Sequence, residues 1–322
     1  MTPKSAEGSG VHTKPNPAQR RSPRAADNQT PERSPAAADP NGGYGDRIAV
    51  VVVTYSPGDT LHELLDSLPE AAERELRVVL ADNGSTDGVP ESAAERDGVT
   101  LVYTGGNVGY GSAANRGAAE LGREYGWLVI ANADVRFGAG SIDELVSAAR
   151  RWPQGGAFGP LITELTGEVY PSARLLPSIG HGIGHGVLGK VWPGNPWTRA
   201  YRQSDTEITE RSAGWLSGSC LLLRRGAFET IGGFDSGYFM YFEDVDLGDR
   251  LRRAGWGSVY VPTAQVRHLG GHATARAPEA MLAAHHRSAY RYLADRHRGL
   301  AWRPLLALIR LGLAARLKLH RH

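Results

Sequence analysis

Short runs of β-branched and aliphatic residues alternate along the chain with segments whose apolar residues recur at helical spacing. Uninterrupted apolar runs of this length are typical of strands buried on both faces of a parallel sheet. These runs occupy residues 48–54, 76–81, 99–103 and 127–131. Residues 61–68 and 141–151 have helical spacing, the second with Ser141 as N-cap and Glu144 at the capping-box position. The alternation predicts an α/β fold with a doubly wound, mostly parallel sheet.

Shorter elements continue the pattern in the second half of the chain. Strand-like composition returns at 215–224 and 258–261, and a short helix is expected at 228–233. A longer helix is expected from Asp244 onward, with an acidic first turn and basic last turns that suit the helix dipole. Gly255 is placed to end that helix.

The two ends of the chain differ from its middle. Residues 1–46 are rich in Pro, Ala, Ser, Asn and Arg and have almost no large apolar side chains, so a disordered tail is expected. Residues 276–322 contain two helical segments, of which 305–319 combines Leu, Ile and Ala with interspersed cations. This last helix either lies in a membrane interface or packs on the preceding domain, and we expect the membrane contact. The domain between the two ends covers residues 47–275.

Composition narrows the classes of function. A hydrophobic fraction of 41% in 322 residues supports a substantial core, and a formal net charge of +2 gives no sign of wholesale nucleic-acid binding. The single cysteine, Cys220, is expected to be a buried structural thiol and fits a reducing compartment. No apolar run resembles a signal peptide or reaches the roughly 20 residues that span a bilayer. We therefore expect a cytoplasmic protein, peripheral on the inner face of the plasma membrane.

Polar turns follow the predicted strands at their carboxyl ends, where doubly wound sheets bind ligands. Residues 82–87 form one such turn after the second strand. Residues 105–111 are rich in glycine and precede a helix, which lets backbone N–H groups approach an anion. Asn132 and Asp134 follow the fourth strand. These turns are expected to meet at one edge of the sheet.

An aromatic and acidic stretch, residues 237–246, leads into the helix that starts at Asp244. A carboxylate at a helix start, walled by aromatic rings, is suited to act as a base. The alternative is an ordinary set of first-turn carboxylates, which the helix dipole favours in any protein. The stretch alone does not decide between the two.

Five motifs stand in a fixed order along the chain, at Val50–Tyr55, Val79–Asp87, Asn107–Gly111, Asn132–Asp134 and Tyr241–Asp246. In this order and spacing they resemble the family 2 inverting glycosyltransferases with the GT-A fold, and the third and fifth resemble the rhamnosyltransferase branch. Each motif alone is weak, since Asp-Asn-Gly turns are common. The resemblance covers roughly residues 47–275, and it implies a GT-A fold with a C-terminal helical extension.

The resemblance implies a binding site for a nucleotide-sugar donor. Its expected residues are Thr54, Tyr55, Asp82, Asn83, Asn107, Gly109, Asn115, Asn132 and Asp134. Asp82 is expected to accept the imide N–H of a pyrimidine base. Asp82-Asn83-Gly84 also has the composition of an Asx turn, and one carboxylate can serve both purposes.

A metal site is implied in the same way. Asn132-Ala-Asp134 takes the place of the family's Asp-x-Asp motif, and Asp134 with His268 is expected to hold Mg²⁺ or Mn²⁺ at the diphosphate. Asn in the first position weakens the anionic site and leaves the strength of metal binding open. His272 is an alternative ligand, and a histidine after a strand is equally compatible with a structural role.

By resemblance, Asp244 is the general base that deprotonates the acceptor hydroxyl. The charges of Glu243 and Asp246 raise the proton affinity of such a base and the helix dipole lowers it, and the sequence leaves the balance open. Acceptor contacts are expected from Trp215, Tyr241 and Glu243, although buried aromatic rings more often belong to a core.

The acceptor implied by the resemblance is lipid-linked. Arg174, His181 and His185 lie where family members carry acceptor loops, and a diphosphate-linked acceptor needs such cations. The implied reaction moves L-rhamnose from dTDP-rhamnose to N-acetylglucosaminyl-diphospho-polyprenol. This is the step that starts the linker between peptidoglycan and arabinogalactan in cell-wall biosynthesis.

Three alternatives stay open at this point. One is a family 2 transferase of a different sugar donor or polysaccharide acceptor. Another is a catalytically silent glycan-binding scaffold, against which the joint presence of Asp82, Asp134 and Asp244 counts. The third is a nucleotidyltransferase, but such enzymes carry a glycine-rich phosphate loop after the first strand, where this chain has Thr-Tyr-Ser-Pro at 54–57.

Overall fold

The computed structural model describes residues 41–177, 208–270 and 278–319. Within them the strands are β1 (Arg47–Thr54), β2 (Leu76–Asp82), β3 (Val99–Tyr103), β4 (Tyr125–Asn132), β5 (Val135–Phe137), β6 (Gly155–Thr163), β7 (Val169–Tyr170), β8 (Ala173–Arg174), β9 (Arg211–Ala213), β10 (Trp215–Leu216), β11 (Cys220–Arg224) and β12 (Gly257–His268). The helices are α1 (Thr60–Ala71), α2 (Val89–Ala93), α3 (Tyr110–Ala119), α4 (Ser141–Arg151), α7 (Arg225–Thr230), α8 (Glu243–Arg253), α10 (Pro278–Arg296), the short η1 (Leu300–Trp302) and α11 (Arg303–Leu319).

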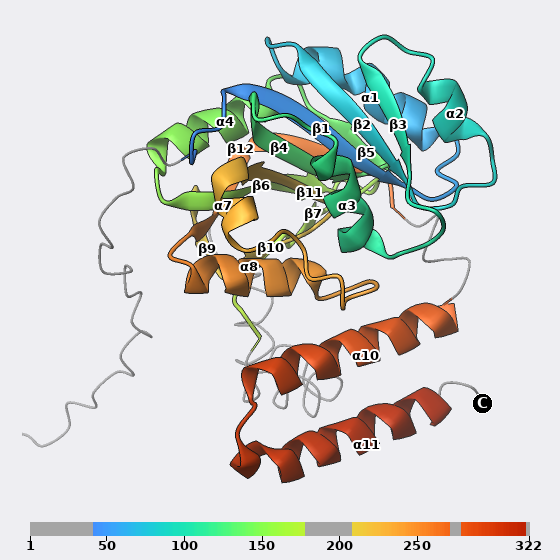
Figure 1. The fold of residues 1–322 in the computed structure, drawn as a ribbon, viewed down its shortest axis with the longest axis vertical. Coiled ribbons are helices and arrows are strands. Elements are labelled where there is room, and N and C mark those ends of the chain that lie inside the picture. The colour runs from blue at the N-terminus through green and yellow to red at the C-terminus, as the bar shows by residue number, and fades with distance from the viewer. Residues whose placement is uncertain (1–40, 178–207, 271–277, 320–322) are drawn as a thin grey trace, which may run out of the picture. The chain divides into compact units, whose positions relative to one another are not determined.

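One large sheet runs through the domain in the order β3-β2-β1-β4-β11-β6-β12-β5 (Figure 1). β7 pairs with β6 and β9 with β12, while β8 and β10 form a separate pair. The four strands from β3 to β4 are parallel, and β12 is parallel to β6. β11 is antiparallel to both of its neighbours. The predicted mostly parallel α/β sheet is confirmed, and the reversal at β11 escaped prediction because hydrophobic periodicity carries no strand direction.

Side chains of β1 alternate between the two faces of the sheet, and each face has its own helices (Figure 1). Val50 and Val52 belong to the core that includes the buried leucines of α1 and the apolar residues of α4. Val51 belongs to the opposite core, with alanines of α3 and leucines of α8. Because successive strand residues point to opposite faces, a strand covered on both sides has to be apolar throughout.

The start of α4 and the strand expected at 215–224 differ from prediction. Ser141 is not the N-cap of α4, because that position is taken by Gly140 in the left-handed region, with φ 66°. The preceding turn needs a positive φ, which glycine supplies without strain. The expected strand is broken into β10 and β11 by a turn at Ser217–Ser219. Gly255, with φ 86°, directly follows the C-cap of α8, as expected for a left-handed terminator.

Residues 41–46, which the sequence assigns to the tail, contact the domain. Asn41 Oδ1 accepts a hydrogen bond from Arg224 Nη1 at 2.9 Å. Asp46 Oδ1 accepts one from Trp127 Nε1, also at 2.9 Å. Residues 1–40 of the expected tail lie outside the described residues.

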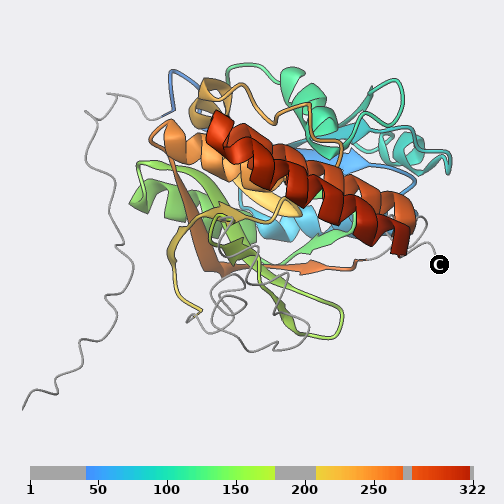
Figure 2. The same ribbon diagram turned by 90° about the horizontal axis from the view of Figure 1, so that it is seen from below.

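The helices α10 and α11 run side by side in opposite directions, as Figures 1 and 2 show. α10 also contacts the segment that precedes α8. Ser288 Oγ donates to the Met240 carbonyl at 2.8 Å, and Arg291 forms an ion pair with Asp235 at 3.0 Å. In the described ranges, no helix is both long and apolar enough to cross a membrane.

Candidate active site

The first two strands end side by side at a buried carboxylate. Thr54 pairs in register with Asp82, and its hydroxyl donates to Asp82 Oδ1 at 3.0 Å. The backbone N–H groups of Gly84 and Ser85 also donate to this carboxylate, at 3.2–3.3 Å, so the Asx turn is present. Asp82 is 2% exposed, whereas Tyr55 beside it is 45% exposed. The Asp82 carboxylate therefore stabilises the turn that it begins, and its contact with the pyrimidine base of a donor stays a prediction.

Two asparagines join this turn to the glycine-rich loop. Asn83 Nδ2 donates to Asn107 Oδ1 at 3.0 Å. Gly109 has φ 90°, and a Cβ at this position would lie 2.3 Å from the carbonyl oxygen of Phe239, so only glycine fits. The Tyr110 N–H donates to the same carbonyl at 3.0 Å. The glycine-rich loop is thus pressed against the segment that leads into α8.

Asn132, Asp134 and His268 meet beyond the carboxyl end of β4. Pairing of β12 with β5 places His268 opposite Val135, next to Asp134 in sequence. His268 Nε2 lies 3.1 Å from Asp134 Oδ1 and 3.3 Å from Asn132 Nδ2. A carboxylate, an imidazole and an amide so close together suit a divalent cation whose other ligands are diphosphate oxygens or water. Among the described residues no group of three His, Cys, Asp or Glu side chains could hold a metal ion by itself.

The turn between β10 and β11, Ser217–Ser219, contacts three of the sequence motifs. Asn132 N–H donates to the last carbonyl of the turn at 3.0 Å, and the Tyr110 hydroxyl donates to the Gly218 carbonyl at 2.6 Å. The Gly218 N–H donates to Asp244 Oδ2 at 3.0 Å. One short turn therefore ties together the metal motif, the glycine-rich loop and the expected base. Its Ser-Gly-Ser composition was the available signal, masked by the apolar residues on both sides.

Asp244 is the second residue of α8 and is held by backbone donors. Besides the Gly218 N–H at Oδ2, its Oδ1 accepts the Val245 N–H at 2.8 Å. Burial raises the pKa of the Asp244 carboxyl above its usual range, while these donors and the positive charge of Arg174 act in the opposite direction. Glu243 is 7% exposed, and burial followed by the charge of Asp244 raises the pKa of its carboxyl as well.

The two acidic neighbours of Asp244 differ in their own partners. Asp246 is paired with Arg250, whose Nε lies 2.6 Å from Asp246 Oδ2, so its charge is largely compensated. Glu243 has no such partner in the described part of the chain, where its Oε2 makes no hydrogen bond. Glu243 is therefore the neighbour whose charge no cation among the described residues compensates, and burial is the largest cause of the raised pKa of Asp244.

Two consecutive residues before α8 have a left-handed backbone. Tyr241 has φ 66° and Phe242 has φ 65°. Bulky residues held in this region cost on the order of 1–3 kcal/mol each and persist only where the surroundings hold them. Here both rings lie 5.4 Å from the ring of His285 on α10, in edge-to-face contact. The helix α10 therefore braces the strained segment that delivers Asp244.

The residues expected to contact the acceptor have different surroundings. Trp215 is 6% exposed, its Nε1–H donates to the Leu175 carbonyl at 3.0 Å, and it packs with Tyr238 in a small core. Tyr241 is only partly buried, and Glu243 is buried beside Asp244. Trp215 thus has a clear packing role, and the acceptor contacts of all three stay predictions.

Asn115, expected to line the donor pocket, forms two hydrogen bonds with the backbone of one residue, Phe234. Its Nδ2 donates to the Phe234 carbonyl at 2.8 Å, and its Oδ1 accepts the Phe234 N–H at 2.9 Å. Both polar atoms of the amide thus anchor the segment that leads toward α8, and a donor contact stays a prediction. His181, His185 and His272 lie outside the described residues.

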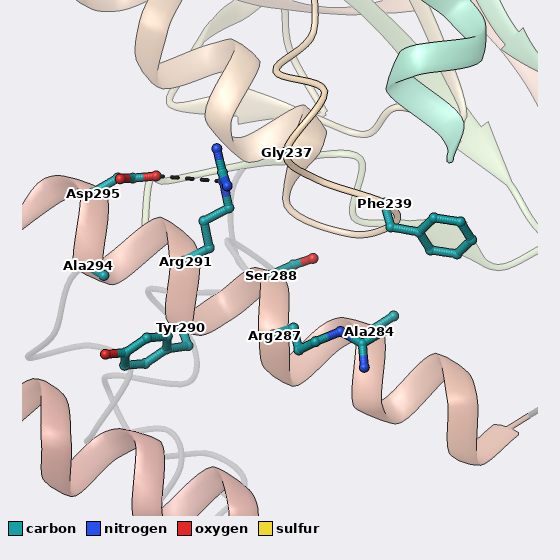
Figure 3. A pocket seen from close by; sticks show the side chains of 9 residues that line it. All are labelled: Gly237, Phe239, Ala284, Arg287, Ser288, Tyr290, Arg291, Ala294 and Asp295. Atoms are coloured by element: carbon teal, nitrogen blue, oxygen red, sulfur yellow. Dashed lines mark ion pairs between the residues drawn. The ribbon is translucent and has the colours of Figure 1, made fainter. Parts of the chain in front are cut away.

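A cavity of about 400 Å³ lies between α10 and the segment before α8 (Figure 3). Its lining is Gly237, Phe239, Ala284, Arg287, Ser288, Tyr290, Arg291, Ala294 and Asp295. Arg291 forms ion pairs with Asp235 and with Asp295. Arg287 is exposed and has neither a hydrogen bond nor an ion pair with any described residue.

Comparison with known proteins identifies the family. Residues 46–291 match the family described as glycosyltransferase like family 2. The chain belongs to this family. N-acetylglucosaminyl-diphospho-decaprenol L-rhamnosyltransferase of Mycobacterium tuberculosis is 56% identical over 281 residues, which cover 84% of this chain and 92% of that protein. Rhamnosyltransferase WbbL of Escherichia coli is 26% identical over 77% of this chain and 92% of its own length.

Solved structures of other glycosyltransferases share the fold. Mannosyltransferase PcManGT from Pyrobaculum calidifontis, in complex with GDP-Man and Mn²⁺, has a TM-score of 0.54 at 19% identity, covering 88% of this chain and 77% of that chain. GalNAc-T7 with UDP, GalNAc and Mn²⁺ has a TM-score of 0.52 at 16% identity, covering 70% and 44%.

The family 2 glycosyltransferase predicted from five motifs is thereby confirmed, as are its GT-A-type fold, its likeness to rhamnosyltransferases and its assignment as an enzyme. The family match ends inside α10, and the boundary at residue 275 stays a prediction.

Proposed function

We propose that this family 2 glycosyltransferase moves L-rhamnose from dTDP-rhamnose to N-acetylglucosaminyl-diphospho-polyprenol, with inversion at the anomeric carbon. The observation that carries the proposal is the 56% identity to the mycobacterial N-acetylglucosaminyl-diphospho-decaprenol L-rhamnosyltransferase over 92% of that protein. The match extends over 84% of this chain, more than the part that carries the motifs. On this reading the product begins the linker between peptidoglycan and arabinogalactan.

Asp244 is the proposed general base. The acceptor hydroxyl gives its proton to the Asp244 carboxylate as its oxygen bonds to the anomeric carbon, and the bond from that carbon to the diphosphate breaks to release dTDP. One displacement with one base produces inversion without a covalent enzyme intermediate. A carboxylate whose pKa is raised by burial takes up a proton more readily than an exposed aspartate, which suits general-base catalysis near neutral pH.

The proposed donor site is the edge of the sheet where the motifs meet. Its residues are Thr54, Tyr55, Asp82, Asn83, Asn107, Gly109, Asn115, Asn132 and Asp134. Asp134 and His268, with the Asn132 amide, would hold Mg²⁺ or Mn²⁺, which when bound would neutralise charge on the departing diphosphate. Two fold relatives were solved with Mn²⁺ and a nucleotide or nucleotide sugar, which supports a divalent ion here. The turn that bonds both Asn132 and Asp244 would keep the leaving group and the base at a fixed separation.

A lipid-linked acceptor places the reaction at a membrane, and we propose that α11 binds its surface on the cytoplasmic side. Leu308 and Leu311 on α11 are 66% and 68% exposed, and the helix has cations but no acidic residue. Exposed leucines beside cations suit an interfacial helix on anionic lipid. The same proposal divides the chain into a tail at 1–46, a catalytic domain at 47–275 and C-terminal helices at 276–322.

Calorimetric titration of the purified chain tests the donor. We expect dTDP-rhamnose to bind more tightly than UDP-N-acetylglucosamine, and more tightly with Mg²⁺ than without it. Preference for the UDP sugar would keep the family and discard the rhamnose assignment. Binding of neither nucleotide sugar would favour a silent scaffold.

A further inference from the structure

Of the three cations that the resemblance places in acceptor loops, Arg174 lies among the described residues, and its charge acts on Asp244. Arg174 is the last residue of β8 and stands opposite Trp215 of β10 in antiparallel register. The chain continues from β10 directly into the turn whose Gly218 N–H donates to Asp244. The β8–β10 pair therefore carries Arg174 to the same part of the site as the base, although the two residues are 70 positions apart in sequence.

The guanidinium of Arg174 is held in place, while its two Nη atoms stay available to bind a ligand. Its Cζ lies 5.3 Å from the ring centroids of both Tyr170 and Trp215. Its Nε donates to the Pro171 carbonyl at 2.7 Å. Within the described ranges, neither Nη atom has a hydrogen-bond partner and no carboxylate pairs with the side chain. Two ring contacts and one hydrogen bond pre-organise the fork, and the two outer nitrogens can bind a further group.

The ligand that best suits the two Nη atoms of Arg174 is an anion. The charge of Arg174 acts on Asp244, but the two side chains do not form an ion pair. In a sugar 1-diphosphate, the reacting hydroxyl and the diphosphate are attached to the same ring, so the width of one sugar ring separates them. A base that meets the hydroxyl therefore needs a cation about one sugar ring away to meet the diphosphate. A guanidinium group binds phosphate oxygens in bidentate fashion, and the pairing of β8 with β10 carries Arg174 beside the strand that leads into the turn holding Asp244.

We propose that Arg174 binds the diphosphate of the acceptor and makes the enzyme selective for sugar diphosphates over neutral glycosides. This inference rests on the proposed function, because it takes the acceptor class from there. The other unpaired arginine near the segment before α8 is Arg287 (Figure 3), which is exposed and is held by no ring or hydrogen bond among the described residues. Arg287 also lines the cavity on α10, where Asp295 is already paired with Arg291.

The test compares two acceptors that differ only in the diphosphate. One is a short-chain lipid diphospho-N-acetylglucosamine, and the other is a neutral alkyl N-acetylglucosaminide of the same chain length. Rates of transfer and direct binding of both acceptors are measured for the wild type, Arg174→Gln, Arg174→Lys and the matched control Arg287→Gln. Donor affinity and melting temperature show whether each variant is folded.

We expect Arg174→Gln to lower kcat/KM for the diphosphate acceptor by about 10- to 100-fold, mainly through KM, because hydrogen bonds to charged groups are lost. The neutral acceptor should lose only a few-fold. Arg174→Lys should fall between, since it keeps the charge and loses the fork. Arg287→Gln should keep the wild-type ratio between the two acceptors.

Three kinetic outcomes would overturn the proposal. Equal losses on both acceptors would assign Arg174 to the support of Asp244, and a wild-type ratio in Arg174→Gln would show no contact with the diphosphate. A loss confined to Arg287→Gln would move the diphosphate to the cavity on α10. Failure of the wild type to transfer rhamnose to either acceptor would count against the proposed function, and the binding ratio would still decide the role of Arg174.

Discussion

Glu243 offers a test of the electrostatics around Asp244. The side chain is 7% exposed, and its Oε2 has no hydrogen-bond partner in the described part of the chain. Burial and the adjacent charge of Asp244 raise the pKa of its carboxyl. Glu243→Gln keeps the size and shape of the side chain but removes the charge. Ionisation of Glu243 should therefore lower the free energy of unfolding of the wild type, and the Gln variant should not have this penalty.

The sign of the effect follows from the direction of the shift. At low pH, below the ordinary Glu pKa of about 4.3, the folded and unfolded chains both hold the proton and no penalty exists. As the pH rises, the unfolded chain releases this proton first. The stability contributed by protonated Glu243 is therefore lost progressively between the unfolded pKa and the higher pKa of the folded state. Burial and the charge of Asp244 raise the pKa of the Glu243 carboxyl to about 8. Since each unit of pKa is worth about 1.4 kcal/mol, we expect a gain on the order of 4–5 kcal/mol for Glu243→Gln near pH 8.5.

The free energies of unfolding of the wild type and the variant are measured in urea at about pH 8.5 and at about pH 4.5, on either side of the pH range in which a buried carboxyl titrates. The gain of Glu243→Gln should shrink to less than about 1 kcal/mol at the lower pH. Glu120→Gln is the matched control, because Glu120 is exposed at the end of α3 and its replacement should be neutral at both pH values. A Glu243→Gln protein that is less stable than the wild type near the higher pH would refute the reasoning, since it would reveal a favourable partner for the ionised carboxylate.

Other parts of the site can be tested one at a time. Asp134→Ala should weaken metal-assisted donor binding at least about ten-fold in calorimetry while metal-free binding changes little, and undiminished binding with metal would remove Asp134 from the metal site. Asn115→Ala should lower the free energy of unfolding by about 1–3 kcal/mol, because both hydrogen bonds to Phe234 are lost; weaker donor binding at unchanged stability would instead make Asn115 a donor contact. Leu308→Glu combined with Leu311→Glu should weaken binding to anionic vesicles at least about ten-fold, and unchanged partitioning would contradict the membrane role of α11.

The edge of the sheet was predictable because parallel strands share a direction. Thr54 ends β1, Asp82 ends β2 and Asn132 ends β4, and these strands are neighbours in the sheet. Carboxyl ends of parallel strands meet at one edge, so residues that follow apolar runs had to converge there. The position of His268 follows from the pairing of β12 with β5, a three-residue strand too short to predict from its pattern.

The surroundings of Asp244 depend on contacts that hydrophobic periodicity does not encode. The turn at Ser217–Ser219 lies between two apolar segments that look like one strand. The amide of Asn115 binds the backbone N–H and carbonyl of Phe234, more than a hundred positions away. The left-handed backbone of Tyr241 and Phe242 is held by His285, which belongs to a different helix. In each case a tertiary contact overrides the local preference of the residue.

Transfer by the purified chain tests the central claim most directly. Wild type and Asp244→Asn are incubated with dTDP-rhamnose, Mg²⁺ and a short-chain lipid diphospho-N-acetylglucosamine, and the lipid product is identified by mass. The account predicts a rhamnosylated lipid with the wild type, and a kcat lower by about 10²–10⁴-fold in Asp244→Asn with donor binding retained, as expected for loss of a general base. Near-normal turnover by Asp244→Asn would require another base, and transfer by the wild type from a different sugar nucleotide alone would contradict the assignment of the donor.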